Sequence, residues 1–161
     1  MKKNKIIFIS SIILLIDQLI KYILVYNVAF SNSISIINNF FNITLIMNDG
    51  AAFSMFSGMQ IGLIIISFAL LAAIYLLFIK NQKLNKSDII IFGILIGGIL
   101  GNLIDRIVHN GVIDYLDFNI FNYNAPIFNF ADICIVISML ILVLKEFGGN
   151  TNENKWWTSW K

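Results

Sequence analysis

The sequence contains few of the residues that usually stabilise or functionalise small soluble proteins. It has one cysteine, Cys134, so no disulfide can form within the chain. The single histidine, His109, argues against a histidine-rich metal site, and we expect no metal and no cofactor. Charged residues make up only 12% of the chain, whereas soluble domains contain about 25%. With 58% hydrophobic residues and a mean hydropathy of +0.84, the composition indicates an integral membrane protein.

The low proline content and the small net charge further narrow the class of protein. One proline in 161 residues is compatible with long uninterrupted helices. The net charge of +2 is small and the basic residues are scattered, which argues against a nucleic-acid partner.

Four segments are long and apolar enough to cross a membrane, which takes about 20 residues per helix. They cover roughly residues 6–26, 61–79, 88–108 and 127–146. The first follows a lysine cluster, as the apolar core of a cleaved signal peptide would. However, Asp17 and Lys21 lie inside it and no convincing cleavage site follows, so we expect a retained helix. The predicted fold class is a mainly α membrane protein with four transmembrane helices.

The basic residues predict the orientation of these helices. Nine of the eleven fall before the first segment, between the second and third, or after the fourth: Lys2, Lys3, Lys5, Lys80, Lys83, Lys86, Lys145, Lys155 and Lys161. Because positive residues favour the cytoplasmic side, both termini are predicted to be cytoplasmic. Residues 27–59 and 109–126 then face outward as connecting segments, and the tail 148–161, with its tryptophan cluster, lies inside.

The outward segment 27–59 is predicted to be a small β structure. Apolar and polar residues alternate across 41–48 with one mismatch, which is typical of a half-buried strand. Asn48, Asp49 and Gly50 then indicate a turn. Residues 109–126 are expected to form a loop.

Carboxylates collect near the predicted outer face. Six of the nine acidic residues lie in the outer segments or the outer halves of helices: Asp17, Asp49, Asp105, Asp114, Asp117 and Asp132. Asp17 and Lys21 are spaced i, i+4, which favours an ion pair. Gly98, Gly101, Asn102 and Asp105 share one helix face, and Asn129 and Asp132 share another. Because an acid within a membrane helix is costly, we interpret Asp132 with Asn129 as functional.

The motifs that the sequence lacks narrow the range of reactions that the protein could catalyse. The sequence has no Gly-x-Ser-x-Gly elbow, no His-Glu-x-x-His and no P-loop. Two aspartates that share a site can hold one proton between them, activate a water molecule and protonate a leaving amine. Such a pair would hydrolyse a peptide without a metal. Asp132 needs a partner, and Asp17, Asp105, Asp114 and Asp117 are all candidates on this reasoning.

Five sequence blocks resemble those of the bacterial lipoprotein signal peptidases, or signal peptidase II. They are Asp17–Lys21 (DQLIK), Asn48–Ser54 (NDGAAFS), Gly97–Arg106 (GGILGNLIDR), Val112–Tyr115 (VIDY) and Phe128–Asp132 (FNFAD). Together they extend along most of the chain, in the family's order. Tyr115 stands where the family usually has phenylalanine.

The resemblance implies a function and a set of site residues. The chain would be an intramembrane aspartic endopeptidase that removes the signal peptide of prolipoproteins, cutting before the diacylglyceryl-modified cysteine. Asp114 and Asp132 would be the catalytic dyad. The substrate-binding or supporting residues would be Asp17, Lys21, Asn48, Gly50, Asn102, Asp105, Arg106 and Asn129. Asp105 is expected beside Arg106, so that the two charges partly offset each other's burial.

The same resemblance sets the expected context. Residues 1–147 would form one peptidase domain in the bacterial inner membrane, monomeric, with its site near the outer leaflet. Its partners would be diacylated prolipoproteins and membrane lipid, and globomycin would inhibit it. The alternatives are a different intramembrane peptidase, or a non-enzymatic carrier that binds a cation through its acids. A carrier is disfavoured because such proteins place their acids near the midplane between internal repeats, and no repeat is visible.

Reporter fusions test the predicted topology. A reporter fused after Lys83 should report cytoplasm, and one fused after Asn119 should report the outer side, because the lysines are expected to remain inside. Paired reporters that are active on opposite sides of the membrane make the measurement. An outward signal from position 83 would contradict the model with both termini inside.

Overall fold

The computed structural model describes residues 2–50, 55–80, 83–120 and 123–148. Most of them are helical. The helices are α1 (Lys2–Asn27), α2 (Gln60–Ala73), its π-helical continuation η2 (Ile74–Ile79), α3 (Lys86–His109) and α4 (Phe130–Gly148). Each helix lies within a few residues of its predicted range. The tryptophans of the predicted tail lie outside the described residues.

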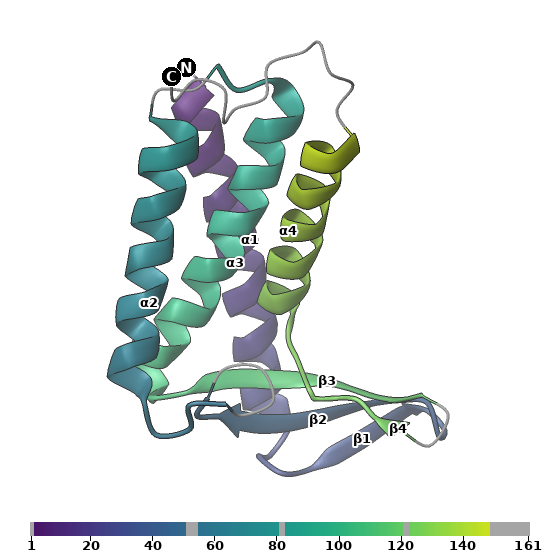
Figure 1. Ribbon diagram of the computed structural model, residues 1–161. Coiled ribbons are helices and arrows are strands. Elements are labelled where there is room, and N and C mark those ends of the chain that lie inside the picture. Colours follow the sequence, from purple (N-terminus) through teal and green to yellow (C-terminus); the bar gives the residue numbers. More distant parts are fainter. Residues whose placement is uncertain (1, 51–54, 81–82, 121–122, 149–161) are drawn as a thin grey trace.

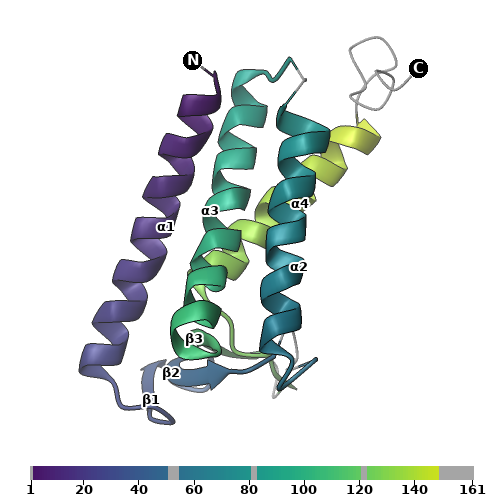
Figure 2. The ribbon, with the colours of Figure 1, turned by 90° about the vertical axis from the view of Figure 1, so that its left-hand side faces the viewer.

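Three of the described helical stretches are long and apolar enough to cross a membrane. They are Lys3–Asn27, Gln60–Ile79 and Lys86–His109, and their outer surfaces expose large apolar side chains such as Leu15, Ile65 and Ile107. The helices run side by side, and a small sheet lies across one of their ends (Figures 1 and 2). The first residues of α1 and the connection between η2 and α3 lie at the opposite end (Figure 1).

The sheet is antiparallel, with the order β1-β2-β3-β4. Its strands are β1 (Ser33–Ile37), β2 (Phe41–Asn48), β3 (Val112–Ile120) and β4 (Tyr123–Asn124). The strand predicted from the alternation in 41–48 is confirmed as β2. The predicted loop at 109–126 is wrong, because most of it forms β3 and β4. Residues 116–120 alternate apolar and polar side chains, a strand signal that the sequence analysis overlooked, whereas the pairing of β3 with β2, more than 60 residues away in sequence, is not visible locally.

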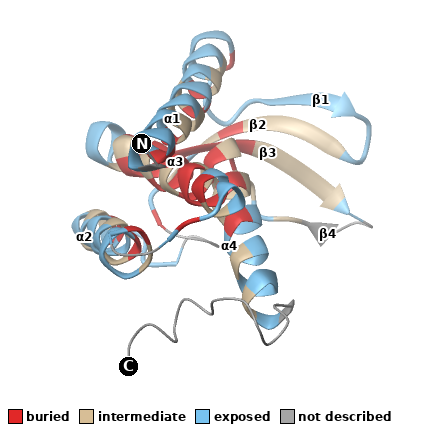
Figure 3. Cartoon of the chain, turned by 90° about the horizontal axis from the view of Figure 1, so that it is seen from above, coloured by how far each residue is buried: buried red, intermediate tan, exposed pale blue. Residues whose placement is uncertain are grey.

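Helix α3 is the centre of the helical layer. It packs against α1, α2 and α4, and half of its 24 residues are buried, as the red ribbon in Figure 3 shows. The capping box of Asn85 and Asp88 begins the helix, and Asn110 ends it in the left-handed conformation. The elements that carry the predicted site residues are thus arranged around one buried helix.

Two adjacent glycines let α3 approach two different helices. A Cβ atom on Gly97 would lie 2.6 Å from Ile13 Cβ of α1. A Cβ atom on Gly98 would lie 2.7 Å from the backbone oxygen of Ala131 in α4. Both distances are shorter than side chains tolerate, so the crossings require glycine, as is common between membrane helices. The small-residue stripe expected on α3 therefore serves close packing on two sides.

Apolar clusters fix the two ends of this assembly. At the end away from the sheet, residues of α1, η2 and α3 form one buried cluster, which includes Ile6, Ile74, Phe92 and Leu95. At the sheet end, Val28, Leu45, Ile113 and Tyr115 form another. The second cluster attaches the end of α1 to β2 and β3, and so it holds the sheet against the helices.

Replacing Gly98 by alanine should destabilise the fold. The added methyl group meets backbone in α4 and cannot be accommodated by a side-chain rotation, and overpacking of this kind costs about 1–3 kcal/mol. Gly62→Ala in α2 is the matched control, because a Cβ atom there meets nothing within 4 Å. Thermal unfolding in detergent, followed by circular dichroism, should show a lower midpoint for Gly98→Ala alone. Equal midpoints would mean that α3 and α4 are not held at this separation.

Candidate active site

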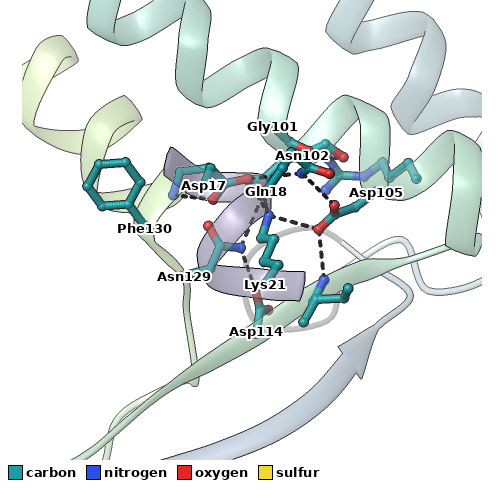
Figure 4. A network of polar contacts seen from close by, with 12 residues as sticks. Asp17, Gln18, Lys21, Gly101, Asn102, Asp105, Asp114, Asn129 and Phe130 are labelled. Atoms are coloured by element: carbon teal, nitrogen blue, oxygen red, sulfur yellow. Dashed lines mark hydrogen bonds and ion pairs between the residues drawn. The ribbon is translucent and has the colours of Figure 1, made fainter. Parts of the chain in front are cut away.

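The predicted site residues meet where the helices reach the sheet (Figure 4). They come from α1, β2, α3, β3 and α4, which no single sequence block contains. The side chains of Asp17, Lys21, Asp105, Asp114 and Asn129 are each at most 2% exposed. A polar cluster buried this deeply must satisfy its own hydrogen bonds and charges.

An ion-pair triad lies at one side of this cluster. Lys21 Nζ is 2.9 Å from Asp17 Oδ2 and 2.8 Å from Asp105 Oδ2, so one ammonium joins α1 to α3. The predicted pair of Asp17 and Lys21 is confirmed. Asp105, expected beside Arg106, instead pairs with Lys21. The ammonium lies between the two carboxylates and offsets their repulsion.

Gln18 is a member of the cluster that the sequence analysis did not single out. Its Nε2 donates to Asp105 Oδ1 at 2.9 Å and also reaches Asp17 Oδ2 at 3.2 Å. The two carboxylates of the triad thus share an amide donor in addition to the ammonium. The sequence carried no distinctive signal for this role, because a glutamine beside a charged residue on a helix is common.

Two asparagine side chains connect Asp114 with Asp132. Asn102 Nδ2 donates to Asp132 Oδ1 at 2.7 Å, and Asn129 Nδ2 donates to Asp114 Oδ1 at 2.6 Å. Asn129 Nδ2 also donates to Asn102 Oδ1 at 3.1 Å. Of the four candidate partners for Asp132, Asp114 shares this amide link. Asp17 and Asp105 are bound by Lys21, and Asp117 accepts a hydrogen bond from Thr44.

Asp114 lies on strand β3, opposite Ile46 of β2, and not in a loop after α3 as expected. Its second oxygen accepts a hydrogen bond from Asn48 Nδ2 at 2.9 Å. Burial raises the pKa of Asp114 from 3.8 to about 6, and the charge of Asp132 adds to this increase. The donors Asn48 and Asn129 act in the opposite direction but do not cancel it. A carboxyl with this pKa can hold or release a proton near neutral pH.

The first turn of α4 is capped completely by side chains. The first four N–H groups of a helix lack partners within the helix. Here Asn129 and Asp132 cap each other's backbone N–H groups, at 3.0 and 3.1 Å. The Phe130 N–H donates to Tyr115 Oη, and the Ala131 N–H donates to Asp17 Oδ1, each at 3.2 Å. The predicted pairing of Asn129 with Asp132 is thus a capping box, which fixes the carboxyl of Asp132.

Tyr115 is a second residue whose role the sequence analysis did not anticipate. Its ring is buried among Val28, Leu45 and Ile113, which places its hydroxyl at the start of α4. The sequence analysis noted only that this position has a tyrosine where the resemblance led us to expect phenylalanine. The hydroxyl supplies a cap that a phenylalanine cannot.

Arg106 and Gly50 lie next to the carboxylates. Arg106 Nη2 donates to the Gly50 carbonyl at 3.3 Å, and Arg106 Nη1 donates to the Asn102 carbonyl at 3.4 Å. The Gly50 N–H donates in turn to Asn48 Oδ1 at 3.0 Å. Within the described ranges, Arg106 Nε is buried without an acceptor. Arg106 therefore retains hydrogen-bonding capacity beside the two aspartates.

The described residues offer no ready metal centre. Within 2–50, 55–80, 83–120 and 123–148, no group of three or more His, Cys, Asp or Glu side chains is arranged to hold a metal ion. The carboxylates that come together are instead occupied by asparagine amides and by one lysine. This arrangement suits proton transfer between two carboxyl groups and a small molecule such as water.

Comparisons with known proteins agree on one group of enzymes. The family model described as signal peptidase (SPase) II matches residues 9–148. Curated lipoprotein signal peptidases of Staphylococcus aureus, for example from strains JH9 and Newman, are 34% identical to this chain over 149 residues. The alignment covers 92% of this chain and 91% of each relative.

Two solved structures of bacterial membrane enzymes, determined by the in meso method, have the same fold. One, at 2.3 Å, is 35% identical, with a TM-score of 0.80 over 94% of this chain and 95% of the other. The second, at 1.9 Å, is 33% identical, also with a TM-score of 0.80, over 91% of this chain and 95% of the other.

The raised pKa of Asp114 predicts a pH-dependent stability. Between about pH 4 and pH 6 the folded chain holds a proton that the unfolded chain has released, so the stabilising contribution is lost as pH rises. The full difference corresponds to about 3 kcal/mol. Unfolding midpoints in detergent should therefore fall more steeply from pH 4 to pH 7 for the wild type than for Asp114→Asn. Parallel curves would show that the pKa of Asp114 is not raised in the folded chain.

Proposed function

The chain belongs to the signal peptidase II family, and from this membership we propose that it removes signal peptides from prolipoproteins with an aspartic dyad, Asp114 and Asp132. The cleaved bond is the one before a diacylglyceryl-modified cysteine. One observation carries the assignment of the dyad. The Asn102 and Asn129 amides donate to these two carboxylates and are bonded to each other.

The two carboxyls divide the work of peptide hydrolysis. At any moment one is ionised and the other protonated, because two like charges in a buried site disfavour double ionisation. The ionised carboxylate takes a proton from a water molecule as the water attacks the scissile carbonyl. The protonated carboxyl donates to the carbonyl oxygen, and a proton then passes to the leaving nitrogen. The pKa of about 6 for Asp114 supports a proton that is exchanged readily near neutral pH.

Arg106, Gly50 and Asn48 position the substrate backbone. The free Nε of Arg106 donates to a substrate carbonyl, while its Nη2 holds the Gly50 segment. Asn48 ties the same segment to Asp114 through its two amide atoms. The segment that holds the substrate is therefore joined to Asp114 by hydrogen bonds through Asn48.

The chain lies in the membrane with the site near the outer leaflet. We infer that α4 also spans, because its 19 residues extend about 28 Å and it exposes Val136, Ile137 and Leu140. Apart from Lys21, the lysines of the described residues belong to the end of the helices away from the sheet, namely Lys2, Lys3, Lys5, Lys80, Lys83, Lys86 and Lys145, which supports a cytoplasmic location for that end and an outward location for the sheet. Diacylated substrates would reach the site from the surrounding lipid, and a monomer is sufficient for this chemistry.

Substitution of the dyad tests the function. Asp114→Asn and Asp132→Asn keep shape and hydrogen-bonding atoms but cannot exchange a proton at working pH. Each should lower turnover of a diacylated prolipoprotein peptide in detergent by about 10²–10⁴-fold or more. The double variant should be little worse than either single one, because the pair acts as a unit.

Asp117→Asn is the matched control, since Asp117 lies on the same strand and its carboxyl contacts Thr44. It should retain substantial activity. An unlipidated peptide of the same sequence should be cleaved poorly, because each buried CH₂ of the acyl chains contributes about 0.8 kcal/mol to capture. Activity that survives in Asp114→Asn but not in Asp117→Asn or Asp105→Asn would mean that Asp132 has a different partner.

A further inference from the structure

The amide group of Asn102 faces an ammonium. Lys21 Nζ lies 3.2 Å from Asn102 Oδ1, in a pair of side chains that are both buried. An ammonium can donate hydrogen bonds but cannot accept them, so the amide atom that faces it must be the oxygen. Asn129 Nδ2 donates to the same oxygen at 3.1 Å. The Asn102 oxygen therefore has two donors, and its orientation is determined by charge.

The orientation of the Asn102 amide determines which hydrogen-bond donors face the two aspartates. With its oxygen toward Lys21, Asn102 must turn its NH₂ group to Asp132, which it reaches at 2.7 Å. Asn129 must in turn direct its NH₂ group toward the Asn102 oxygen and Asp114 Oδ1. The oxygen of Asn129 is then left to accept the Asp132 N–H. The ammonium thus orients the Asn102 amide, and the Asn129 amide, already oriented by the Asp132 N–H, is matched to it.

We propose that Lys21 is a positioning residue that orients the Asn102 amide, so that Asn102 donates a hydrogen bond to Asp132 and accepts one from Asn129, the donor to Asp114. This inference rests on the proposed function of Asp114 and Asp132. Without the ammonium, only the Asn129 NH₂ group holds the Asn102 oxygen in place, and the Asn102 amide can rotate by half a turn. Its oxygen would then face the carboxylate of Asp132, and the two acceptors would repel unless a proton lies between them. That proton would no longer be available for exchange with the substrate.

The surroundings of Lys21 allow charge and hydrogen bonding to be separated. Asp17, Lys21 and Asp105 together carry one negative charge. Replacing Asp17 by asparagine and Lys21 by a neutral residue leaves the same net charge, on Asp105, which keeps Gln18 and the Ile113 N–H as donors. The Oδ1 atom of an asparagine at position 17 can still accept the Ala131 N–H. Such double variants remove the ammonium without leaving an additional unpaired charge.

The experiment compares Asp17→Asn/Lys21→Gln with Asp17→Asn/Lys21→Met. The two variants are similar in size and equal in charge, but only glutamine provides an N–H donor for Asn102. With a diacylated prolipoprotein peptide in detergent, kcat of the methionine variant should be about tenfold lower than kcat of the glutamine variant. KM should differ little, because the acyl chains and Arg106 still hold the substrate. A role in folding alone would not separate kcat from KM in this way.

The same two variants are then compared in a chain that also carries Asn102→Ala. If Lys21 acts through Asn102, the glutamine and methionine variants should have equal kcat once Asn102 is removed. Equal kcat with Asn102 present would overturn the inference, and so would a difference that persists in Asn102→Ala. These outcomes are independent of the proposed function, which fails if Asp114→Asn and Asp132→Asn remain active.

A measurement that leaves Lys21 unchanged covers the case in which the methionine variant does not fold. With ¹⁵N-labelled asparagine, the NH₂ signal of Asn102 should shift strongly in Asp132→Ala, because that group is bonded to the Asp132 carboxylate. An unchanged Asn102 signal would show that its NH₂ group does not face Asp132. That result would overturn the inference without any variant of Lys21.

Discussion

The buried ammonium of Lys21 is the contact on which the rest of the site depends. Removing a charge from water costs several kcal/mol, and the cost is recovered only if partners surround the charge with good geometry. Lys21 has Asp17 and Asp105 at 2.9 and 2.8 Å and the Asn102 amide oxygen at 3.2 Å. Each partner also bonds to another element. The ammonium therefore joins α1 and α3 and, through Asp17 and Asn102, reaches α4.

The hydrogen bonds at the start of α4 show how α1 and β3 determine the position of this helix. The N–H of Ala131 is capped by Asp17, a residue of α1, and the N–H of Phe130 by Tyr115, a residue of β3. A helix whose first turn is capped from two other elements cannot rotate or slide without losing these bonds. Because Asp132 is in the same turn, its carboxyl is fixed relative to α1 and β3. Positional precision of this kind is what a site for proton transfer needs.

Much of the fold could be predicted from the sequence because its strongest signals are local. Each helical segment is an apolar run of spanning length, and β2 alternates in period two, so both appear within a few residues of their predicted limits. Strand β3 was missed because its signal is short. Only residues 116–120 alternate in period two, and the first half of the strand, which carries Asp114, does not.

In the candidate site, too, contacts within one helix could be predicted and contacts between elements could not. Spacing along one helix was enough to predict the pair of Asp17 and Lys21 and the association of Asn129 with Asp132. It was not enough to show that Asp105 pairs with Lys21, or that Gln18 joins the cluster, because those contacts connect α1 with α3. The choice of Asp114 as the partner of Asp132 came from resemblance to a family, and local pattern left four candidates. Contacts between elements carry information that a single sequence does not display.

The two members of the proposed dyad lie on different kinds of secondary structure, and this has a consequence for the site. Asp114 is placed by the register of β3 on β2 and by Asn48, whereas Asp132 is placed by the caps of α4. Neither constraint alone sets the distance between the carboxyls. The bond between the Asn129 and Asn102 amides joins the two constraints, at 3.1 Å, and both asparagines are buried. The relative geometry of the carboxyls is therefore a property of the polar network as a whole, so a residue such as Lys21 can influence both without contacting either.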